Sequence, residues 1–222
     1  HEFREAGLDR VNISLDTLIA ERYRDITRGG EIHHVWDAIA EAERAGLSPV
    51  KINVVPVRGV NDDELVKFAA LTLYKDVHIR FIEFMPVGNS GVWKPDAYLS
   101  KDEIMERVAS VGKLVRLPFK GGGPSRNYRV EGAQGMIGFI SPISDCFCGS
   151  CNRLRLTAVG KIRPCLFSEL SVDIKTPLRN GVSDAELEDL YRNAVLSKPA
   201  RHNLHEGTVL HPALSPMSQI GG

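Results

Sequence analysis

The sequence predicts an α/β fold in which parallel strands and crossover helices occupy residues 1–111, followed by a mixed α+β region over residues 112–222. Two observations lead to this prediction. Strand-like and helix-like segments alternate three times in the first half of the chain, which is typical of parallel strands joined by crossover helices. After Gly112 the segments become short strands interrupted by glycine and proline.

The first half supplies the repeating units. Residues 10–15 (RVNISL) alternate polar and apolar side chains with the period of a strand, and residues 31–46 have apolar side chains at helical spacing. Residues 50–57 and 77–85 are the second and third strands. A Ser or Asn followed three residues later by Glu predicts the start of the helix after each of these strands and of a last helix near the end; these pairs are Asn61 with Glu64, Ser100 with Glu103, and Ser183 with Glu186.

The beginning of the chain does not match a complete domain of this kind. Residues 1–8 look like the last turns of a helix that ends at Gly7, but no strand precedes them. Three parallel strands would also leave two unpaired sheet edges. We therefore expect that the front of the domain is missing.

Composition and charge limit the function classes. The 28 basic and 28 acidic side chains balance, so nothing in the global charge indicates a nucleic acid or an anionic membrane surface as partner. No apolar run approaches the roughly 18 residues of a membrane span, and the first residues have no secretory apolar region. We expect a cytoplasmic protein. Four cysteines within twenty residues are then more typical of a metal site than of a disulfide framework.

Three of the four cysteines have a spacing that suits a metal centre. Cys148 and Cys151 are separated by two residues, and Cys165 follows after thirteen intervening residues. A structural zinc usually takes four ligands, whereas a four-iron cluster held by three cysteines leaves one iron open to another ligand. Cys146 could be a fourth ligand, although next to Cys148 on an extended strand it would be crowded on one ion. Spacing alone leaves an iron–sulfur cluster and a zinc site equally open, with a redox dithiol at Cys148 and Cys151 less favoured.

Basic side chains lie in the same segment. In an extended strand Arg153 and Arg155 point to one face, and Leu154 and Leu156 point to the other, which we expect to be buried. Residues 146–166 contain four basic side chains and no acidic one. Guanidinium groups suit phosphate oxygens, so a polyphosphate bound beside the metal is one interpretation. Arginines paired with acids elsewhere, on a solvated edge strand, are the other.

Several segments together resemble one enzyme family. They are FCGSCNRLRLTAVGKIRPCL, RVNISLDTL, PVKINVVPVRGVNDDE, IRFIEFMPVG and the terminal GG. The matches run in order along the whole chain and resemble the GTP 3′,8-cyclase family of radical S-adenosylmethionine enzymes, also called molybdenum cofactor biosynthesis protein A. The resemblance implies a partial (βα)6 TIM-like barrel, of which this chain would be the C-terminal half, followed by a mixed α+β region that carries a cluster site.

The resemblance also implies roles for matching residues. Cys148, Cys151 and Cys165 would hold a C-terminal 4Fe-4S cluster, while Cys146 lies outside the family pattern and is expected to be a bystander. Arg153 and Arg155 are the catalytic candidates. Substrate and cofactor contacts are also implied: GTP would contact Lys51, Arg153, Leu154 and Arg155; S-adenosylmethionine would contact Ser14 and Met85; and Gly221 and Gly222 match the family's C-terminal pair.

The reaction implied by the resemblance needs a second 4Fe-4S cluster. In the family that cluster passes an electron to S-adenosylmethionine, and the resulting 5′-deoxyadenosyl radical removes hydrogen from C3′ of GTP, which then closes a bond to C8 of guanine. The Cys-x3-Cys-x2-Cys motif that binds it does not occur in these 222 residues. We therefore expect a fragment that is inactive alone.

Further expectations concern partners and a competing function. Besides GTP and S-adenosylmethionine, the expected partners are an electron donor and the next enzyme of the molybdopterin pathway, with a homodimer as one option; neither a nucleic acid nor a membrane is expected. The competing interpretation is a zinc-stabilised module that binds a nucleotide or a protein without catalysis. Radical chemistry on peptides is less favoured, because a peptide site does not need the Arg153 and Arg155 pair.

Overall fold

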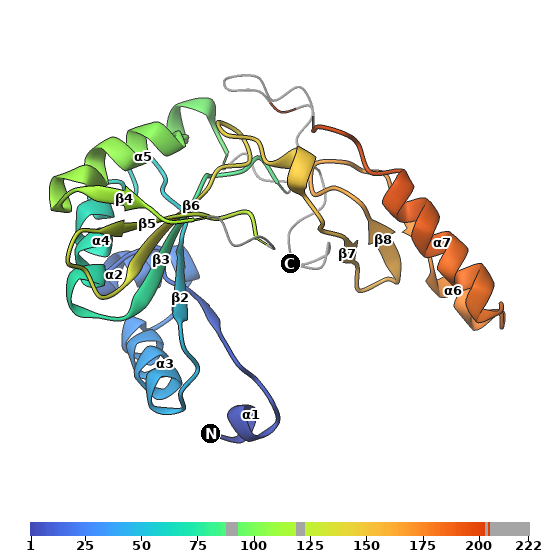
Figure 1. Cartoon of the computed structure of the whole chain (residues 1–222), viewed down its shortest axis with the longest axis horizontal. Helices are drawn as coiled ribbons and strands as arrows, with labels where there is room; N and C mark the ends of the chain where they lie inside the picture. The colour runs from blue at the N-terminus through green and yellow to red at the C-terminus, as the bar shows by residue number, and fades with distance from the viewer. Residues whose placement is uncertain (88–92, 119–122, 203, 205–222) are drawn as a thin grey trace. The chain divides into compact units, whose positions relative to one another are not determined.

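The computed structural model of the chain describes residues 1–87, 93–118, 123–202 and 204. The chain folds into two compact units (Figure 1). The sheet unit comprises His1–Phe84 and Asp96–Ser141, and the cysteine unit comprises Met85–Pro95 and Pro142–Gly222.

The sheet unit begins as the alternating pattern predicts. Its first three strands are parallel neighbours: β1 (Asn12–Ser14), β2 (Val50–Val54) and β3 (Val77–Ile82). The connections between them contain the helices α2 (Ala20–Thr27), α3 (Ile32–Arg44) and α4 (Leu65–Tyr74). A short helix, α1 (Glu2–Glu5), precedes β1 and is followed by Gly7, whose φ of 96° favours glycine. The predicted α/β fold is confirmed.

Three later strands extend the same sheet. They are β4 (Leu114–Arg116), β5 (Arg126–Val130) and β6 (Met136–Ile140), and they follow η1 (Pro95–Ala97), α5 (Lys101–Val108) and η2 (Ala109–Val111). The strand order is β1-β2-β3-β6-β5-β4, with β6 parallel to β3 and antiparallel to β5. The expected boundary between residues 111 and 112 therefore falls inside the sheet unit. The physical reason is that β6 pairs with β3 along its whole length, a long-range contact that strand periodicity does not specify.

One face of the sheet forms the hydrophobic core. Ile52, Ile79 and Ile137 lie at the same level of three adjacent strands, and each is no more than 1% exposed. The covering helices contribute side chains to this cluster, among them Ile39, Phe68 and Ile104. Complete burial of a side chain of this size contributes about 1.5–3 kcal/mol, so this face fixes the register of the strands. The polar side chains of β1, β2 and β3 are consequently left on the opposite face.

Local capping signals start two helices as predicted. In α5 the Ser100 side chain accepts a hydrogen bond from the Glu103 backbone, and the Glu103 carboxylate accepts from the Ser100 backbone. Ser183 and Glu186 form the same reciprocal pair at the start of α7 (Asp184–Leu196).

The predicted cap at Asn61 is wrong. Helix α4 begins at Leu65, and Asn61 lies in the preceding turn. Its side-chain amide donates to the carbonyls of Asp16 (2.7 Å) and Val55 (3.0 Å), and its Oδ1 accepts from the Val57 backbone N–H (2.7 Å). Asn61 is 2% exposed and ties together the loops that follow β1 and β2. The carboxylate of Glu64 is buried nearby and accepts hydrogen bonds from Thr17 Oγ1 and the Leu18 backbone, both at 2.6 Å.

The cysteine unit contains a small antiparallel sheet and two helices. Its strands, in the order β7-β8-β9, are β7 (Arg155–Leu156), β8 (Lys161–Arg163) and β9 (Val172–Asp173). The 3-10 helix η3 (Cys148–Ser150) precedes them, and α6 (Lys175–Arg179) and α7 follow. This is the mixed α+β region with the cysteines that the sequence predicts.

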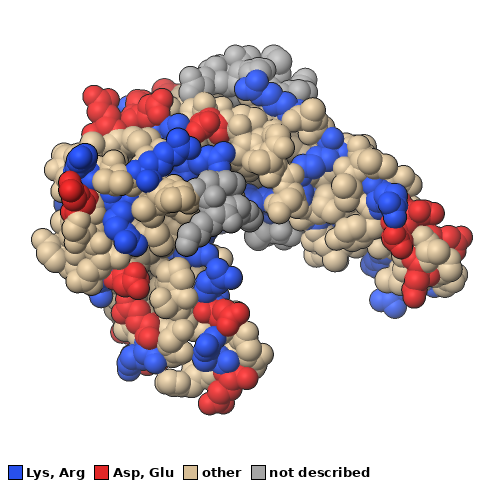
Figure 2. All heavy atoms as spheres, viewed as in Figure 1, with Lys and Arg blue, Asp and Glu red and all other residues tan. Residues whose placement is uncertain are grey.

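Helix α7 has a mixed charged surface. Figure 2 shows acidic and basic side chains together at the α6–α7 end of the cysteine unit, and Glu188 pairs with Arg192 at 2.7 Å. No helix within the described residues has both the length and the apolar character needed to cross a membrane.

Candidate functional site

The four cysteines lie in the turns that frame the small sheet. All four are free thiols and are partly buried. The chain bends at Phe147, whose φ of −101° and ψ of 20° are not those of a strand, and enters η3 at Cys148. The Cys151 backbone N–H then donates to the Cys148 carbonyl at 3.1 Å. The segment from Cys146 to Cys148 is therefore turned rather than extended, and the crowding expected for two thiols on one face of a strand does not apply.

Strand pairing returns Cys165 to this region. Arg155 of β7 pairs with Arg163 of β8, so the hairpin brings Cys165, two residues beyond Arg163, back toward the segment that follows Cys151. Lys198 supports the turn from the other side, because its Nζ donates to the carbonyls of Arg153 (2.6 Å) and Pro164 (3.1 Å).

The thiols influence one another electrostatically. Burial raises the pKa of Cys148 to about 11; a hydrogen bond from the His202 backbone N–H opposes this effect, and the neighbouring thiols of Cys146 and Cys165 add to it. A negative charge on Cys148 is therefore costly without a cation beside it. A bound metal supplies that cation, since metals take cysteine as the thiolate.

The closest group of metal-binding side chains differs from the expected trio. Donor atoms of Cys146, Cys148 and His202 all lie within 4.8 Å of one another. Cys151 and Cys165 are outside this group among the described residues. A cluster does not require such closeness from its three cysteines, because each binds a different iron, whereas ligands of a single ion must crowd around one point. The bystander role expected for Cys146 stays a prediction, and no pattern in the sequence indicates His202 as a member of this group.

The two arginines have different surroundings. Arg155 is half-buried. Burial lowers its pKa, as do the guanidinium groups of Arg153 and Arg163, while the nearby sulfurs of Cys151 and Cys165 raise it. Arg153 is exposed, and its guanidinium carbon lies 5.7 Å from the centre of the Phe147 ring. Arg155 thus lies within electrostatic reach of two of the three cysteines and of two other positive charges. An anion there would offset the mutual repulsion of the guanidinium groups.

One expectation about this segment is corrected. Leu156 is not buried but 64% exposed, because β7 is a two-residue edge strand with little sheet to cover it. Arg163 is 4% exposed and binds the Ser168 carbonyl and the Glu169 carboxylate. It is held by the protein itself, so only part of the basic segment is available to a ligand.

The sheet unit carries a second group of polar side chains. The strand register places them at two successive levels of the face opposite the core: Asn12, Lys51 and His78 at one level, and Ser14, Asn53 and Arg80 at the next, where Gly138 of β6 is the neighbour of Arg80. Ser14 and Lys51, both predicted as site residues, therefore share this face. Alternation in VKINV and VHIRFI indicates Asn53, His78 and Arg80 as further members, which the sequence reading overlooked.

This polar face is positively charged and partly ordered by its own hydrogen bonds. Arg80 donates to Asn53 Oδ1 at 2.9 Å and to Asn12 Oδ1 at 2.6 Å. Burial lowers the pKa of Lys51, and the positive charges of Arg80 and Arg10 lower it further. Burial likewise lowers the pKa of His78 to about 4, so its imidazole is neutral near pH 7. Two cations on a partly buried surface indicate an anionic ligand.

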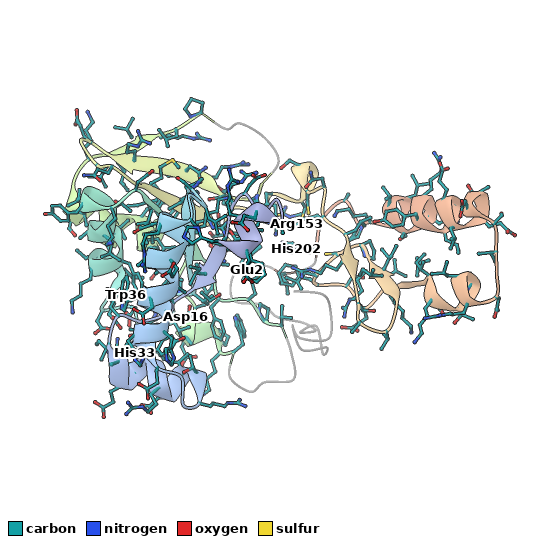
Figure 3. All side chains as sticks on the ribbon, turned by 90° about the horizontal axis from the view of Figure 1, so that it is seen from below. Glu2, Asp16, His33, Trp36, Arg153 and His202 are labelled. Carbon is teal, nitrogen blue, oxygen red and sulfur yellow. The ribbon has the colours of Figure 1, made fainter. Side chains whose placement is uncertain are left out.

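The remaining expected contacts lie in other segments. Met85 is partly buried and follows β3, three residues after Ile82, in the part of the chain that belongs to the cysteine unit. Gly221 and Gly222 lie outside the described residues. Figure 3 labels Arg153, which lies between η3 and β7, and His202, which follows α7.

Comparison with known proteins identifies relatives along the whole chain. Residues 1–72 match the family model for the radical SAM superfamily, and residues 77–204 match that for Molybdenum Cofactor Synthesis C. The GTP 3′,8-cyclase of Heliobacterium modesticaldum is 51% identical over 224 residues, covering 100% of this chain and 68% of the relative. Those of Moorella thermoacetica and Pelotomaculum thermopropionicum are 50% and 48% identical, each covering 99% of this chain and 67% of the relative. The chain spans about two thirds of the length of these curated relatives.

Proposed function

This chain belongs to the GTP 3′,8-cyclase family, and on that premise we propose that it serves the radical conversion of GTP to 3′,8-cyclo-7,8-dihydroguanosine 5′-triphosphate in molybdenum cofactor biosynthesis. The observation that carries the proposal is the position of Arg155, a half-buried guanidinium that interacts electrostatically with Cys151 and Cys165. A nucleotide whose base contacts a metal centre and whose phosphates contact arginine needs these two chemistries side by side.

The donor set fits an iron–sulfur cluster. Iron in such clusters is held by cysteine thiolates, and Cys148, Cys151 and Cys165 supply three sulfurs from a turn and a hairpin of one unit. Their electrostatic contacts link Cys148 with Cys165, and Arg155 with Cys151 and Cys165. These residues would hold the C-terminal 4Fe-4S cluster, with one iron left open for the substrate.

The residues of the chain would bind and orient the substrate. Arg153 and Arg155 present two guanidinium groups in three residues, a spacing that suits bidentate contacts with phosphate oxygens, and the Leu154 backbone lies between them. Lys51 would add a third cation to GTP, and Arg80 lies on the same face of the sheet. Ser14 and Met85 would contact S-adenosylmethionine. When bound, the cofactors supply the radical chemistry, so the protein's contribution is orientation and the exclusion of water.

The proposal includes the cellular context of the reaction. The 222 residues contain no Cys-x3-Cys-x2-Cys motif, so turnover would need a polypeptide that carries the first cluster. An electron donor and the next enzyme of the molybdopterin pathway complete the sequence of reactions, which we place in the cytoplasm, and a homodimer is compatible with it.

The cluster assignment is tested by metal analysis after anaerobic reconstitution of the metal-free chain with iron and sulfide. We expect about four irons and four sulfides per chain, as one such cluster requires. Cys148→Ser, Cys151→Ser and Cys165→Ser should each lose the cluster, whereas Cys146→Ser should retain it. Failure of the wild-type chain to retain iron and sulfide would refute the assignment. The same sample should form no 5′-deoxyadenosine from S-adenosylmethionine and a reductant, and appreciable formation would contradict the expected inactivity of the chain alone.

The substrate assignment is tested by equilibrium dialysis of GTP against the reconstituted chain. Each charge-assisted hydrogen bond is worth about 1.5–3 kcal/mol, so Arg153→Ala and Arg155→Ala should weaken binding roughly 10- to 100-fold. Arg155→Lys should restore only part of the loss, because an ammonium group cannot make the paired contacts of a guanidinium. Arg179→Ala is the matched control, since Arg179 is exposed at the end of α6 in the same unit. Equal affinity of all variants would rule out the two arginines as GTP ligands.

A further inference from the structure

Two residues of the cysteine unit form a donor group with Cys148 that the proposed cluster does not use. Donor atoms of Cys146 and His202 lie within 4.8 Å of each other and of that of Cys148. The chain turns at Phe147, between the two cysteines, and within this turned segment their sulfurs lie within 4.8 Å of each other. His202 comes from a segment more than fifty residues away, which the chain brings back after α7.

The surroundings of His202 fix its orientation as they do for metal-binding histidines. The side chain is 6% exposed, and its Nε2 lies 2.6 Å from the Pro142 carbonyl. A carbonyl only accepts, so Nε2 carries the proton and Nδ1 carries the lone pair. Nδ1 accepts a longer hydrogen bond, 3.1 Å, from the Leu204 backbone N–H. Histidine ligands usually donate their other ring N–H to a backbone carbonyl or carboxylate, which is the arrangement seen here.

The backbone also positions His202 against Cys148. The backbone N–H of His202 favours a charge on the Cys148 sulfur, and the donor atoms of the two side chains lie within 4.8 Å of each other. A hydrogen bond from a backbone N–H stabilises a thiolate. Cys148 is therefore placed between two possible sets of partners: Cys151 and Cys165 in the cluster, or Cys146 and His202 in the group described here.

We propose that Cys146, Cys148 and His202 form a mononuclear site for a thiophilic divalent cation of the zinc class in the cluster-free chain. Two thiolates and one imidazole are ligands that Zn²⁺ prefers, and a water molecule completes the tetrahedron. Binding releases one proton from each of the two thiols, and the ion replaces the hydrogen bond between Leu204 and Nδ1. The site does not depend on the proposed cyclase function. Only its consequence does: an ion bound there occupies Cys148 and hinders assembly of the cluster.

The test uses Co²⁺ as a spectroscopic probe of the metal-free full chain under anaerobic conditions. We expect one Co²⁺ per chain, with thiolate-to-metal charge-transfer absorption and the visible bands of tetrahedral cobalt, both abolished by Zn²⁺. Cys146→Ser should remove one thiolate from the spectrum and weaken Co²⁺ binding by more than the roughly 10- to 100-fold that loss of an outer hydrogen-bond partner costs a metal site. His202→Gln should weaken it similarly.

Cys151→Ser is the matched control, because this cysteine is equally partly buried but lies outside the group. It should leave the cobalt spectrum and affinity unchanged. Unchanged binding in Cys146→Ser, or a loss in Cys151→Ser as large as in Cys146→Ser, would overturn the proposal, whether or not the chain assembles a cluster. Near-ultraviolet circular dichroism shows whether a variant is misfolded. If one of the variants Cys146→Ser and His202→Gln is misfolded, Co²⁺ binding by the other variant decides the outcome.

The competition has its own measurement. Added Zn²⁺ should lower the yield of cluster on reconstitution of the wild-type chain, and Cys146→Ser should resist this inhibition. Equal sensitivity of the two proteins would contradict the competition while leaving the cobalt result to decide the site.

Discussion

Replacement of Glu64 should be among the most destabilising single changes in the sheet unit. Its carboxylate is fully buried, and it accepts hydrogen bonds from Thr17 Oγ1 and the Leu18 backbone N–H, each at 2.6 Å, together with an ion pair from Arg22. These contacts fix the loop that follows β1, and therefore the end of the strand that carries Ser14. Glu64 thus links core stability to the geometry of the polar face.

The magnitude follows from the two hydrogen bonds. A hydrogen bond to a charged group is worth about 1.5–3 kcal/mol, so Glu64→Ala should lower the free energy of unfolding by about 3–6 kcal/mol. Glu64→Gln keeps one good acceptor and should lose about half of that amount. The contact with Arg22 is left out of this sum, because its guanidinium is partly exposed and the attraction is screened by solvent.

Urea unfolding followed by Trp36 fluorescence measures this effect. Trp36 packs against the core of the sheet unit, and a Trp93→Phe background removes the signal of the other tryptophan. Glu106→Gln is the control, because Glu106 is exposed on α5 in the same unit and should change stability by less than about 0.5 kcal/mol. If Glu64→Ala were as stable as this control, the buried carboxylate would not organise the loop as described.

Three further predictions concern the sheet unit. The pKa of His78 in the folded chain, about 4, lies below its ordinary value of 6.5, so between these pH values only the unfolded chain binds a proton at His78. About 3 kcal/mol of the free energy of unfolding should therefore be lost as the pH falls through this window. Urea titrations at several pH values should show this loss in the wild type but not in His78→Gln. Gly138→Ala should lower the free energy of unfolding by about 1–3 kcal/mol, because the added Cβ would lie 2.3 Å from Ser125 Oγ and 2.8 Å from His78 Nε2. A melting temperature equal to that of the wild type would contradict this tight contact. Ser100→Ala should cost about 1 kcal/mol by removing the cap of α5, while Ser100→Asp should recover most of it in the same thermal melts.

Signals that act over a few residues were readable from the sequence. The alternation in RVNISL predicted the first strand, and the Ser-x-x-Glu pairs predicted the starts of α5 and α7, because a cap needs only the backbone of its own first turn. Family membership was equally readable, since the residues that carry it keep their order and spacing along the chain. The roles that the family resemblance implies for the cysteines and arginines stay predictions.

Contacts between distant segments were decided by the tertiary structure. The pairing of β6 with β3 and the role of Asn61 in joining two loops each depend on which segments the fold brings together. The group of Cys146, Cys148 and His202 is the clearest case, because a bend at Phe147 and a return of the chain after α7 had to coincide. The sequence determines which donor side chains are present, whereas the folded backbone determines which of them lie close enough to bind one ion.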